Sequence, residues 1–261
     1  MTADPYGIWC LQETERRRGE RIDMYTFSSR VRYSEIDASG NISLNAIINY
    51  FQDCTTFHSE DVGKGILRLK EEHKVWMLSS WQIVIEKYPV FGQNIIIGTQ
   101  PYDFKGMLGF RNFVIMDENR YPVVKANSIW CLLDTDTGRP IRVSEEDAAC
   151  YGTGEKLDME YADRKIAIPA GGKEMEPFFV RPHQIDTNHH VNNGEYVLMA
   201  REYLPEGCVI RQVRAEYKRQ AVLGDKMLPT VIRADNGYVV VLNNENNSPY
   251  AVVEFVQESE A

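Results

Sequence analysis

Long apolar runs are missing from this sequence. None approaches the roughly 20 residues that a helix needs to cross a bilayer, so no membrane insertion is expected. Residues 1–23 hold an arginine cluster but no apolar stretch ahead of a cleavage site, which argues against a secretory signal. We therefore set residues 1–23 apart as a polar N-terminal arm and expect a cytoplasmic protein.

Cysteine is scarce and poorly spaced for a structural role. The 261 residues include five cysteines, an odd number, and no two of them have CxxC spacing. This usage fits a reducing cytosol, and it argues against both a disulfide framework and a thiolate zinc site.

Positive charge is also in deficit. The formal net charge is −9, with 38 acidic against 29 basic side chains, whereas binding to nucleic acid needs a basic footprint. No nucleic-acid partner is therefore expected. The hydrophobic fraction of 43% and the aromatic fraction of 11% indicate instead a globular protein with a substantial core.

What the sequence does contain is an internal repeat. The segment EIDASGNISLN (35–45) aligns without gaps with QIDTNHHVNNG (184–194). The alignment pairs Asp37 with Asp186, Ser39 with Asn188, and Asn41 with His190. Each copy runs into apolar residues at the i, i+3, i+4, i+7 spacing of a helix. In the second copy, Asn192 lies three residues before Glu195 and predicts a helix cap.

Strand-like segments surround each predicted helix. One precedes each copy of the repeat, at 24–33 and 176–183, and about four follow each helix. The following segments are 75–89, 93–104, 107–117 and 122–134 in the first half, and 208–220, 225–235, 238–243 and 250–257 in the second. One helix against one antiparallel sheet leaves an edge strand unpaired. Two such units can pair their edges, so the sequence predicts an α+β fold of two similar lobes that form an internal pseudo-dimer.

The join between the lobes is predicted from a change in composition. Around residues 150–175 the chain is rich in glycine and charge and has no clean periodicity. We predict an N-terminal lobe over 24–155, a linker over 156–175 and a C-terminal lobe over 176–261.

These residues resemble a known family, the double hot-dog acyl-ACP thioesterases, in a form related to the plant enzymes. IDTNHHVNNGEYV (185–197) resembles the family's D-x-N-x-H-V-N-N motif, and AEYKRQ (215–220) resembles its E-Y-x-R strand. In the first lobe, 73–93 and 126–140 resemble two of the family's strands, and the likeness covers roughly residues 24–257. The resemblance implies a tandem hot-dog fold, with each lobe an antiparallel β-sheet wrapped around a long helix.

The same resemblance implies a function. A family member hydrolyses the thioester of fatty acyl-acyl carrier protein by activated water, releases the free fatty acid and so terminates fatty acid synthesis. It needs no metal or organic cofactor. Acyl-chain binding falls to the N-terminal lobe and catalysis to the C-terminal lobe, and the implied partner is acyl carrier protein.

By resemblance, the family's catalytic aspartate, asparagine and histidine fall on Asp186, Asn188 and His190. Two positions depart from the plant pattern, in which Glu and Cys follow E-Y-x-R, because this sequence has Gln220 and Ala221 there. Alanine cannot be a nucleophile, so a cysteine-acyl intermediate at that position is excluded. Gln220 can orient a water molecule but cannot accept its proton near neutral pH.

Hydrolysis of a thioester needs an attacking water, a proton acceptor and donors for the developing oxyanion. His190 is the predicted base, because an imidazole ordinarily titrates near neutral pH. Asn188 is predicted to position the water or the carbonyl, Asp186 to orient the imidazole or the amide, and Gln220 to support them. Asp186 stays open as the alternative base if burial raises its proton affinity. The alternating spacing would bring residues 186, 188 and 190 to one side in an extended or loop conformation.

The same residues also allow interpretations other than a hydrolytic site. Asp186 and Asn188 could be turn or capping residues, a structural role that also fits Asp37 in the first copy. A metal site would use His183, Asp186, His189 and His190, but adjacent histidines rarely bind one ion and no cysteine is close, so no metal is expected. The functional rivals are a hot-dog acyl-CoA thioesterase and a non-catalytic acyl-binding protein.

A basic segment in the second half predicts where the acidic carrier protein docks. Its members are Arg211, Arg214, Lys218, Arg219 and Lys226. Complementary charge would guide the carrier to them, and the alternative is a solvated strand face. The internal pseudo-dimer is compatible with either a monomer or a homodimer.

Overall fold

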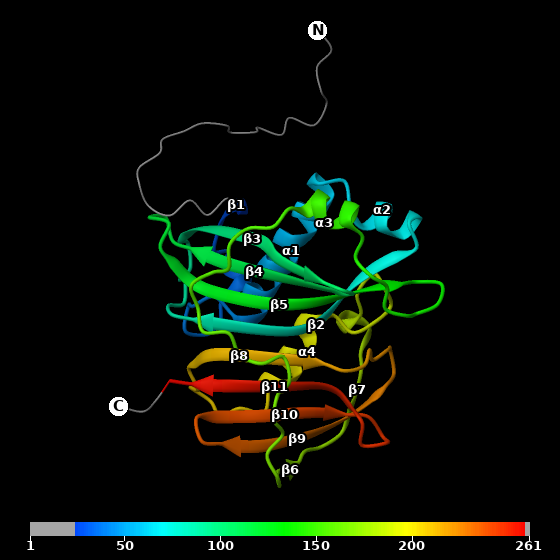
Figure 1. Cartoon of the computed structure of the whole chain (residues 1–261). Helices are drawn as coiled ribbons and strands as arrows, with labels where there is room; N and C mark the ends of the chain where they lie inside the picture. The colour runs from blue at the N-terminus through cyan, green and yellow to red at the C-terminus, as the bar shows by residue number, and fades with distance from the viewer. Residues whose placement is uncertain (1–23, 259–261) are drawn as a thin grey trace.

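An eleven-stranded antiparallel sheet dominates the computed structural model, which describes residues 24–258 (Figure 1). The predicted arm over 1–23 lies outside the described residues. The strands are β1 (Tyr25–Arg30), β2 (Lys74–Ile85), β3 (Asn94–Lys105), β4 (Leu108–Met116), β5 (Pro122–Asp134), β6 (Lys173–Glu174), β7 (Phe178–Phe179), β8 (Ile210–Tyr217), β9 (Lys226–Ala234), β10 (Gly237–Asn243) and β11 (Pro249–Gln257). The α-helices are α1 (Leu44–Asp61), α2 (Ile66–Glu71), α3 (Glu145–Tyr151) and α4 (Asn193–Arg201).

The two halves of the chain join edge to edge. The strand order is β1-β3-β4-β5-β2-β8-β11-β10-β9-β6, with β7 also paired to β9. β2 of the first half and β8 of the second pair antiparallel, with Trp81 opposite Ala215. In Figure 1 the first-half strands lie above this seam and the second-half strands below it. The prediction that two lobes pair their open edges into one sheet is confirmed.

The two predicted helices are present but differ in length. α1 has 18 residues and is capped by the preceding Ser43, whose side chain accepts a hydrogen bond from the Ala46 backbone N–H. α4 has 9 residues and is capped by the preceding Asn192, whose side-chain oxygen accepts the Gly194 N–H at 2.9 Å. The predicted cap at Asn192 is therefore confirmed. None of the helices in residues 24–258 is both long enough and apolar enough to cross a membrane.

One hydrophobic core serves both lobes. On the first-lobe side, the Phe51 ring of α1 lies 5.9 Å from the Trp81 ring and 5.1 Å from the Phe113 ring, between centroids. The same buried cluster continues into the second lobe through Val213 of β8 and Phe255 of β11. The lobes are therefore held by shared burial of apolar surface as well as by the β2–β8 hydrogen bonds.

The predicted linker packs against the sheet. Residues 152–172 contain no helix or strand, yet their backbone bonds to side chains of the sheet. The Ala162 N–H donates to Gln82 at 2.9 Å, and the Ile166 N–H donates to Glu216 at 3.1 Å. Gln82 also donates to Gln212 across the seam at 3.0 Å. The linker thus covers the β2–β8 junction on the sheet face opposite the helices. Glu216, which the sequence pattern indicates as a surface charge, is buried beneath it.

Candidate active site

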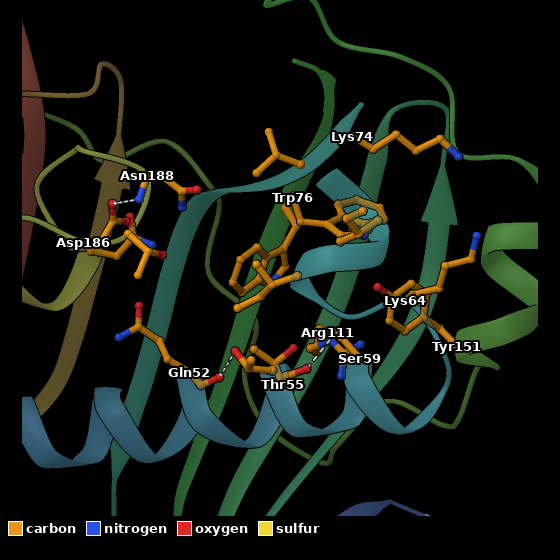
Figure 2. A pocket seen from close by; sticks show the side chains of 18 of the residues that line it. Gln52, Thr55, Ser59, Lys64, Lys74, Trp76, Arg111, Tyr151, Asp186 and Asn188 are labelled. Carbon is orange, nitrogen blue, oxygen red and sulfur yellow. Dashed lines mark hydrogen bonds between the residues drawn. The ribbon is translucent and has the colours of Figure 1, made fainter. Parts of the chain in front are cut away.

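A cavity of about 750 Å³ lies between the two lobes and extends into the first (Figure 2). One wall is α1 with the short helix α2, and the opposite wall is the inner face of β2, β4 and β5. The second lobe closes one end with residues of the repeated motif, among them Asp186, Thr187 and Asn188. The cavity therefore unites the lobe predicted to bind the acyl chain with the lobe predicted to carry catalysis.

The aspartate of the motif builds a tight turn. One oxygen of Asp186 accepts the Asn188 N–H at 2.7 Å and the His190 N–H at 3.3 Å. The Asp186 N–H in turn donates to the His190 carbonyl at 2.8 Å. His189 takes a left-handed conformation with φ 64°, as the reversal of the chain requires. Residues 186–190 therefore form a turn rather than an extended segment.

The first copy of the repeat forms the same turn. One oxygen of Asp37 accepts the Ser39 N–H at 2.9 Å and the Asn41 N–H at 3.3 Å. The two aspartates therefore share a structural role in their lobes, as Asx residues commonly do. Only the second copy faces the cavity, since none of residues 37, 39 and 41 is part of its lining.

The predicted site residues take different places around this turn. Asp186 and Asn188 line the cavity, and Figure 2 shows them together at one end of it. His190 is half-buried and is not among the lining residues, and its Nδ1 is buried without a hydrogen-bond partner in the described structure. No hydrogen bond joins the Asp186 carboxylate to the His190 ring. Gln220 is exposed, and its Nε2 donates to the Met77 sulfur at 3.1 Å instead of to the motif.

Sequence analysis missed a polar group on the first-lobe side of the cavity. Arg111 on β4 lines it with only 7% of its surface exposed. Its Nη1 donates to His58 Nδ1 at 3.0 Å and to Thr99 Oγ1 at 3.2 Å. Burial lowers the pKa of Arg111 to about 10, so it stays cationic at neutral pH. Burial and the Arg111 charge lower the pKa of His58 to about 4, so the imidazole is neutral.

A second charged group fixes the two short helices beside the cavity. Lys64 and Lys74 both pair with Glu72 and Asp147, at N–O distances of 2.8–3.1 Å. Although burial acts in the opposite direction, hydrogen bonds from Lys64 and Lys74 lower the pKa of Asp147 to about 2. Arg68 of α2 also pairs with Glu72 at 2.8 Å, so two carboxylates hold three cations and tie α2 and α3 to β2.

Asp147→Asn is expected to reduce the free energy of unfolding by about 3 kcal/mol, because it leaves Lys64, which is buried, and Lys74 to share the single carboxylate of Glu72. The Asp147 pKa lies below its ordinary value of about 3.9, so its contribution is complete above about pH 4 and is lost as the pH falls toward 2. Urea unfolding of both proteins between pH 3 and pH 7 measures this. The exposed Asp136 supplies the control, since Asp136→Asn should change stability by less than about 0.5 kcal/mol. A difference that persists unchanged at pH 3 contradicts the prediction.

Known proteins show similarity over both lobes. The model of the acyl-ACP thioesterase N-terminal domain matches residues 8–151, and that of the C-terminal domain matches residues 169–248. The chain belongs to the acyl-ACP thioesterase family. Among curated family members, it is 25% identical over 232 residues to the chloroplastic acyl-acyl-carrier-protein hydrolase FATB1 of Cuphea viscosissima, covering 82% of this chain and 54% of the relative. It is also 25% identical over 238 residues to the chloroplastic palmitoyl-acyl carrier protein thioesterase of Arabidopsis thaliana, covering 84% and 56%.

Solved structures of the family share the fold. An acyl-ACP thioesterase from Bacteroides thetaiotaomicron superposes with a TM-score of 0.81 at 21% identity, covering 90% of this chain and 98% of that one. The 12:0-ACP thioesterase from Umbellularia californica gives a TM-score of 0.80 at 17% identity, covering 93% and 100%. The predicted tandem hot-dog fold is thereby confirmed. The chain spans about half the length of the curated relatives it matches.

Within this family the chain departs from the plant motif at Gln220 and Ala221. Ala221 is fully buried, and its N–H donates to the Tyr196 hydroxyl at 2.8 Å. A methyl group in this position offers neither a nucleophile nor a base. No three His, Cys, Asp or Glu side chains of residues 24–258 converge in an arrangement that could hold a metal ion.

Proposed function

We propose that this chain hydrolyses the thioester of fatty acyl-acyl carrier protein and releases the free fatty acid, a reaction that ends fatty acid synthesis. The observation that carries the proposal is that Asp186 and Asn188 meet a cavity of about 750 Å³ whose other walls belong to the first lobe. Family membership supports the reaction type. The cysteine usage supports a cytoplasmic location.

The cavity supports a division of labour between the lobes. Aromatic side chains of the first lobe, Trp76, Phe104, Phe110 and Trp130, give its walls an apolar character suited to an acyl chain. With the acyl group in the cavity, its thioester would lie beside the polar turn at residues 186–188. The carrier protein, too large to enter, stays outside with its thiol arm reaching this turn.

Hydrolysis in this arrangement needs one water molecule. The water oxygen attacks the thioester carbonyl carbon while a base removes one of its protons. The Asn188 amide and the backbone N–H of Asn193, the first residue of α4 and part of the cavity lining, can donate to the negatively charged carbonyl oxygen. The tetrahedral intermediate then collapses by breaking the carbon–sulfur bond, and the departing thiolate takes up the proton. The products are the fatty acid and the free carrier thiol.

Asp186 is the base that this geometry favours. One of its oxygens is engaged in the turn, which leaves the other free to accept a proton from a water in the cavity. His190, the base predicted from the sequence, lies off the cavity wall, and its imidazole is not held by the Asp186 carboxylate. Catalytic hydrogen bonds often tighten only when substrate binds, so His190 is the rival base that substitution must test.

Turnover of matched substrates tests the proposed function. The full chain is given acyl-ACP and acyl-CoA with the same acyl group, and the liberated acid is quantified. We expect release of free acid with a higher kcat/KM for acyl-ACP. A preference for acyl-CoA supports the rival thioesterase. Tight binding of acyl-ACP without any free acid supports the non-catalytic acyl-binding protein.

The predicted carrier-docking residues are largely engaged in ion pairs. Arg211 pairs with Glu258, Arg214 with Glu254, Lys218 with Glu216, and Lys226 with Glu245. Arg214 also donates to the Asp163 and Lys165 carbonyls of the linker, so it stabilises the fold. Arg219 is exposed and forms no side-chain ion pair within residues 24–258, which makes it the best remaining candidate for carrier docking.

Arg219→Glu is expected to raise KM for acyl-ACP about two- to fivefold, because an exposed charge pair contributes about 0.2–1 kcal/mol. A small thioester that lacks the carrier should be hydrolysed as before. Arg120→Glu, an exposed site in the turn between β4 and β5, is the matched control and should leave both substrates unaffected. Equal losses on acyl-ACP and on the small thioester argue against docking at Arg219.

A further inference from the structure

The cavity ends on a cation that has no carboxylate partner. Arg111 lies on the same face of β4 as Phe113 and Ile115, which are fully buried in the core. Its two hydrogen-bond acceptors, His58 and Thr99, are both uncharged. Among residues 24–258, no aspartate or glutamate forms an ion pair with it. An isolated buried cation is strongly unfavourable unless something compensates its charge.

The neighbouring charges do not supply that compensation. Lys64 and Lys74 are already matched by Glu72 and Asp147. Neither carboxylate is therefore spare for Arg111, which stays a buried cation on the cavity wall without a carboxylate partner.

A second unpartnered polar group lies beside the guanidinium. The Tyr151 hydroxyl is buried, and no described residue has a donor or acceptor in good hydrogen-bond geometry with it. Burial raises the pKa of Tyr151, and the nearby Ser59 and Trp76 side chains only partly oppose this effect. The Tyr151 ring centroid is 5.6 Å from the guanidinium carbon of Arg111, and both side chains line the cavity. Figure 2 shows Arg111, Ser59 and Tyr151 at the end of the cavity away from Asp186 and Asn188. The Ser59 hydroxyl already donates to the Thr55 carbonyl at 2.9 Å, so the donors at this end of the cavity are the Arg111 guanidinium and the Tyr151 hydroxyl. Together these two groups form a site for an oxygen acceptor, best for an anionic one.

We propose that this end of the cavity binds a carboxylate at the far end of the acyl chain, so that the preferred substrates are ω-carboxyacyl thioesters. The carboxylate would pair with Arg111 and accept from Tyr151, which compensates the buried charge. This assignment rests on the proposed function, since it names the acyl group on which the same site acts.

The spacing along α1 sets the chain length. Gln52 approaches Asn192 of the second lobe at 3.4 Å, and Ser59 lies beside Tyr151 and Arg111. Ser59 is seven residues further along the helix than Gln52, which corresponds to roughly 10 Å along the helix axis. Since a carbon–carbon bond of about 1.5 Å advances an extended chain by roughly 1.3 Å, an acyl group of about eight carbons spans the two ends.

A substrate series tests the inference. Eight-carbon acyl-ACPs that end in a methyl, a hydroxyl or a carboxylate group are compared on the full chain and on Arg111→Met. The wild type should prefer the carboxylate-ended chain to the methyl-ended chain by about 10- to 100-fold in kcat/KM, the range expected for a charged hydrogen-bonded pair. Arg111→Met should reverse this preference. Because the result is a ratio of two substrates on one protein sample, partial unfolding of the variant does not affect it.

Other outcomes contradict the inference. They are a wild type that prefers the methyl-ended chain, a ratio unchanged by Arg111→Met, and a hydroxyl-ended chain accepted as well as the carboxylate-ended one. Calorimetric binding of N-ethyl amides of the same acyl groups separates this inference from the proposed function, since amides bind without being turned over. Tighter binding of the carboxylate-ended amide with no thioester hydrolysis would overturn the proposed hydrolase function and support the carboxylate site at Arg111. Hydrolysis with no preference among chain ends would support the hydrolase function and overturn the carboxylate site.

Discussion

Asp186→Asn is expected to lower kcat for acyl-ACP hydrolysis by about 10²- to 10⁴-fold, the contribution typical of a positioned general base. Asparagine keeps a side-chain oxygen that can accept the N–H groups of Asn188 and His190, so the turn should form as before. It loses the second carboxylate oxygen, which is the proton acceptor on the cavity wall. Single-turnover hydrolysis measures the chemical step, and thermal unfolding reports on the turn.

The first lobe offers a matched control for this substitution. Asp37 accepts the same two backbone hydrogen bonds in the equivalent turn, but it does not line the cavity. Asp37→Asn should therefore leave kcat unchanged and should shift the melting temperature no more than Asp186→Asn does. Similar losses of kcat in both variants would mean that Asp186 acts only through the turn.

The same measurement decides between the two candidate bases. If Asp186 takes the proton, His190→Asn retains the acidic limb of the pH–rate profile. If His190 takes it, that limb disappears in His190→Asn, while Asp186→Asn stays active. The profiles are compared on kcat/KM, which reports on groups of the free enzyme.

The architecture follows from features that are local in the sequence. The two copies of the Asp turn, each before an apolar helix pattern, identify the lobes, and an unpaired edge in each predicts that the lobes join edge to edge. That β2 and β8 are the strands that join is seen only in the structure. The pattern of the second helix extends to Tyr203, yet α4 ends at Arg201. Pro205 explains the difference, because the residue before a proline avoids the helical conformation.

The features that sequence analysis missed depend on partners distant in the chain. Glu216 has the spacing of an exposed charge on a strand, and only the path of the linker buries it against the Ile166 N–H. The ion pair of Arg214 with Glu254 arises from the pairing of β8 with β11. The sequence did contain an indication for Arg111, because its charge alternates onto the same face of β4 as the apolar residues Phe113 and Ile115. The cavity that this charge faces is formed only by the folded chain.

Within the motif, the turn explains why spacing alone did not place all three side chains. The alternating spacing predicts that residues 186, 188 and 190 project to one side in an extended or loop conformation, but strict alternation of side chains holds only for an extended backbone. The hydrogen bond from Asp186 N–H to the His190 carbonyl closes the segment into a turn instead. Asp186 and Asn188 reach the cavity, and His190 follows the chain toward α4.

Asn188→Ala is expected to lower kcat by about 10²- to 10³-fold with a smaller change in KM, because an amide that donates to the oxyanion acts mainly in the transition state. The Asn188 side chain is exposed to the cavity, and its backbone N–H, not its amide, forms the turn. The fold should therefore be unaffected. Steady-state kinetics on acyl-ACP and a thermal melt of each variant measure both effects.

Ser39→Ala is the control for Asn188→Ala, because Ser39 holds the equivalent place in the first-lobe turn and is not part of the cavity lining. It should leave kcat unchanged. Asn188→Gln retains the amide but moves it by one methylene, so its kcat should fall between the wild type and Asn188→Ala. Since a displaced donor stabilises the oxyanion less while still filling the space, this order separates a chemical role from a steric one. Full activity in Asn188→Ala would mean that the Asn188 amide has no role in the reaction. Asp186 would then be the only side chain of the motif that acts on the substrate from the cavity wall.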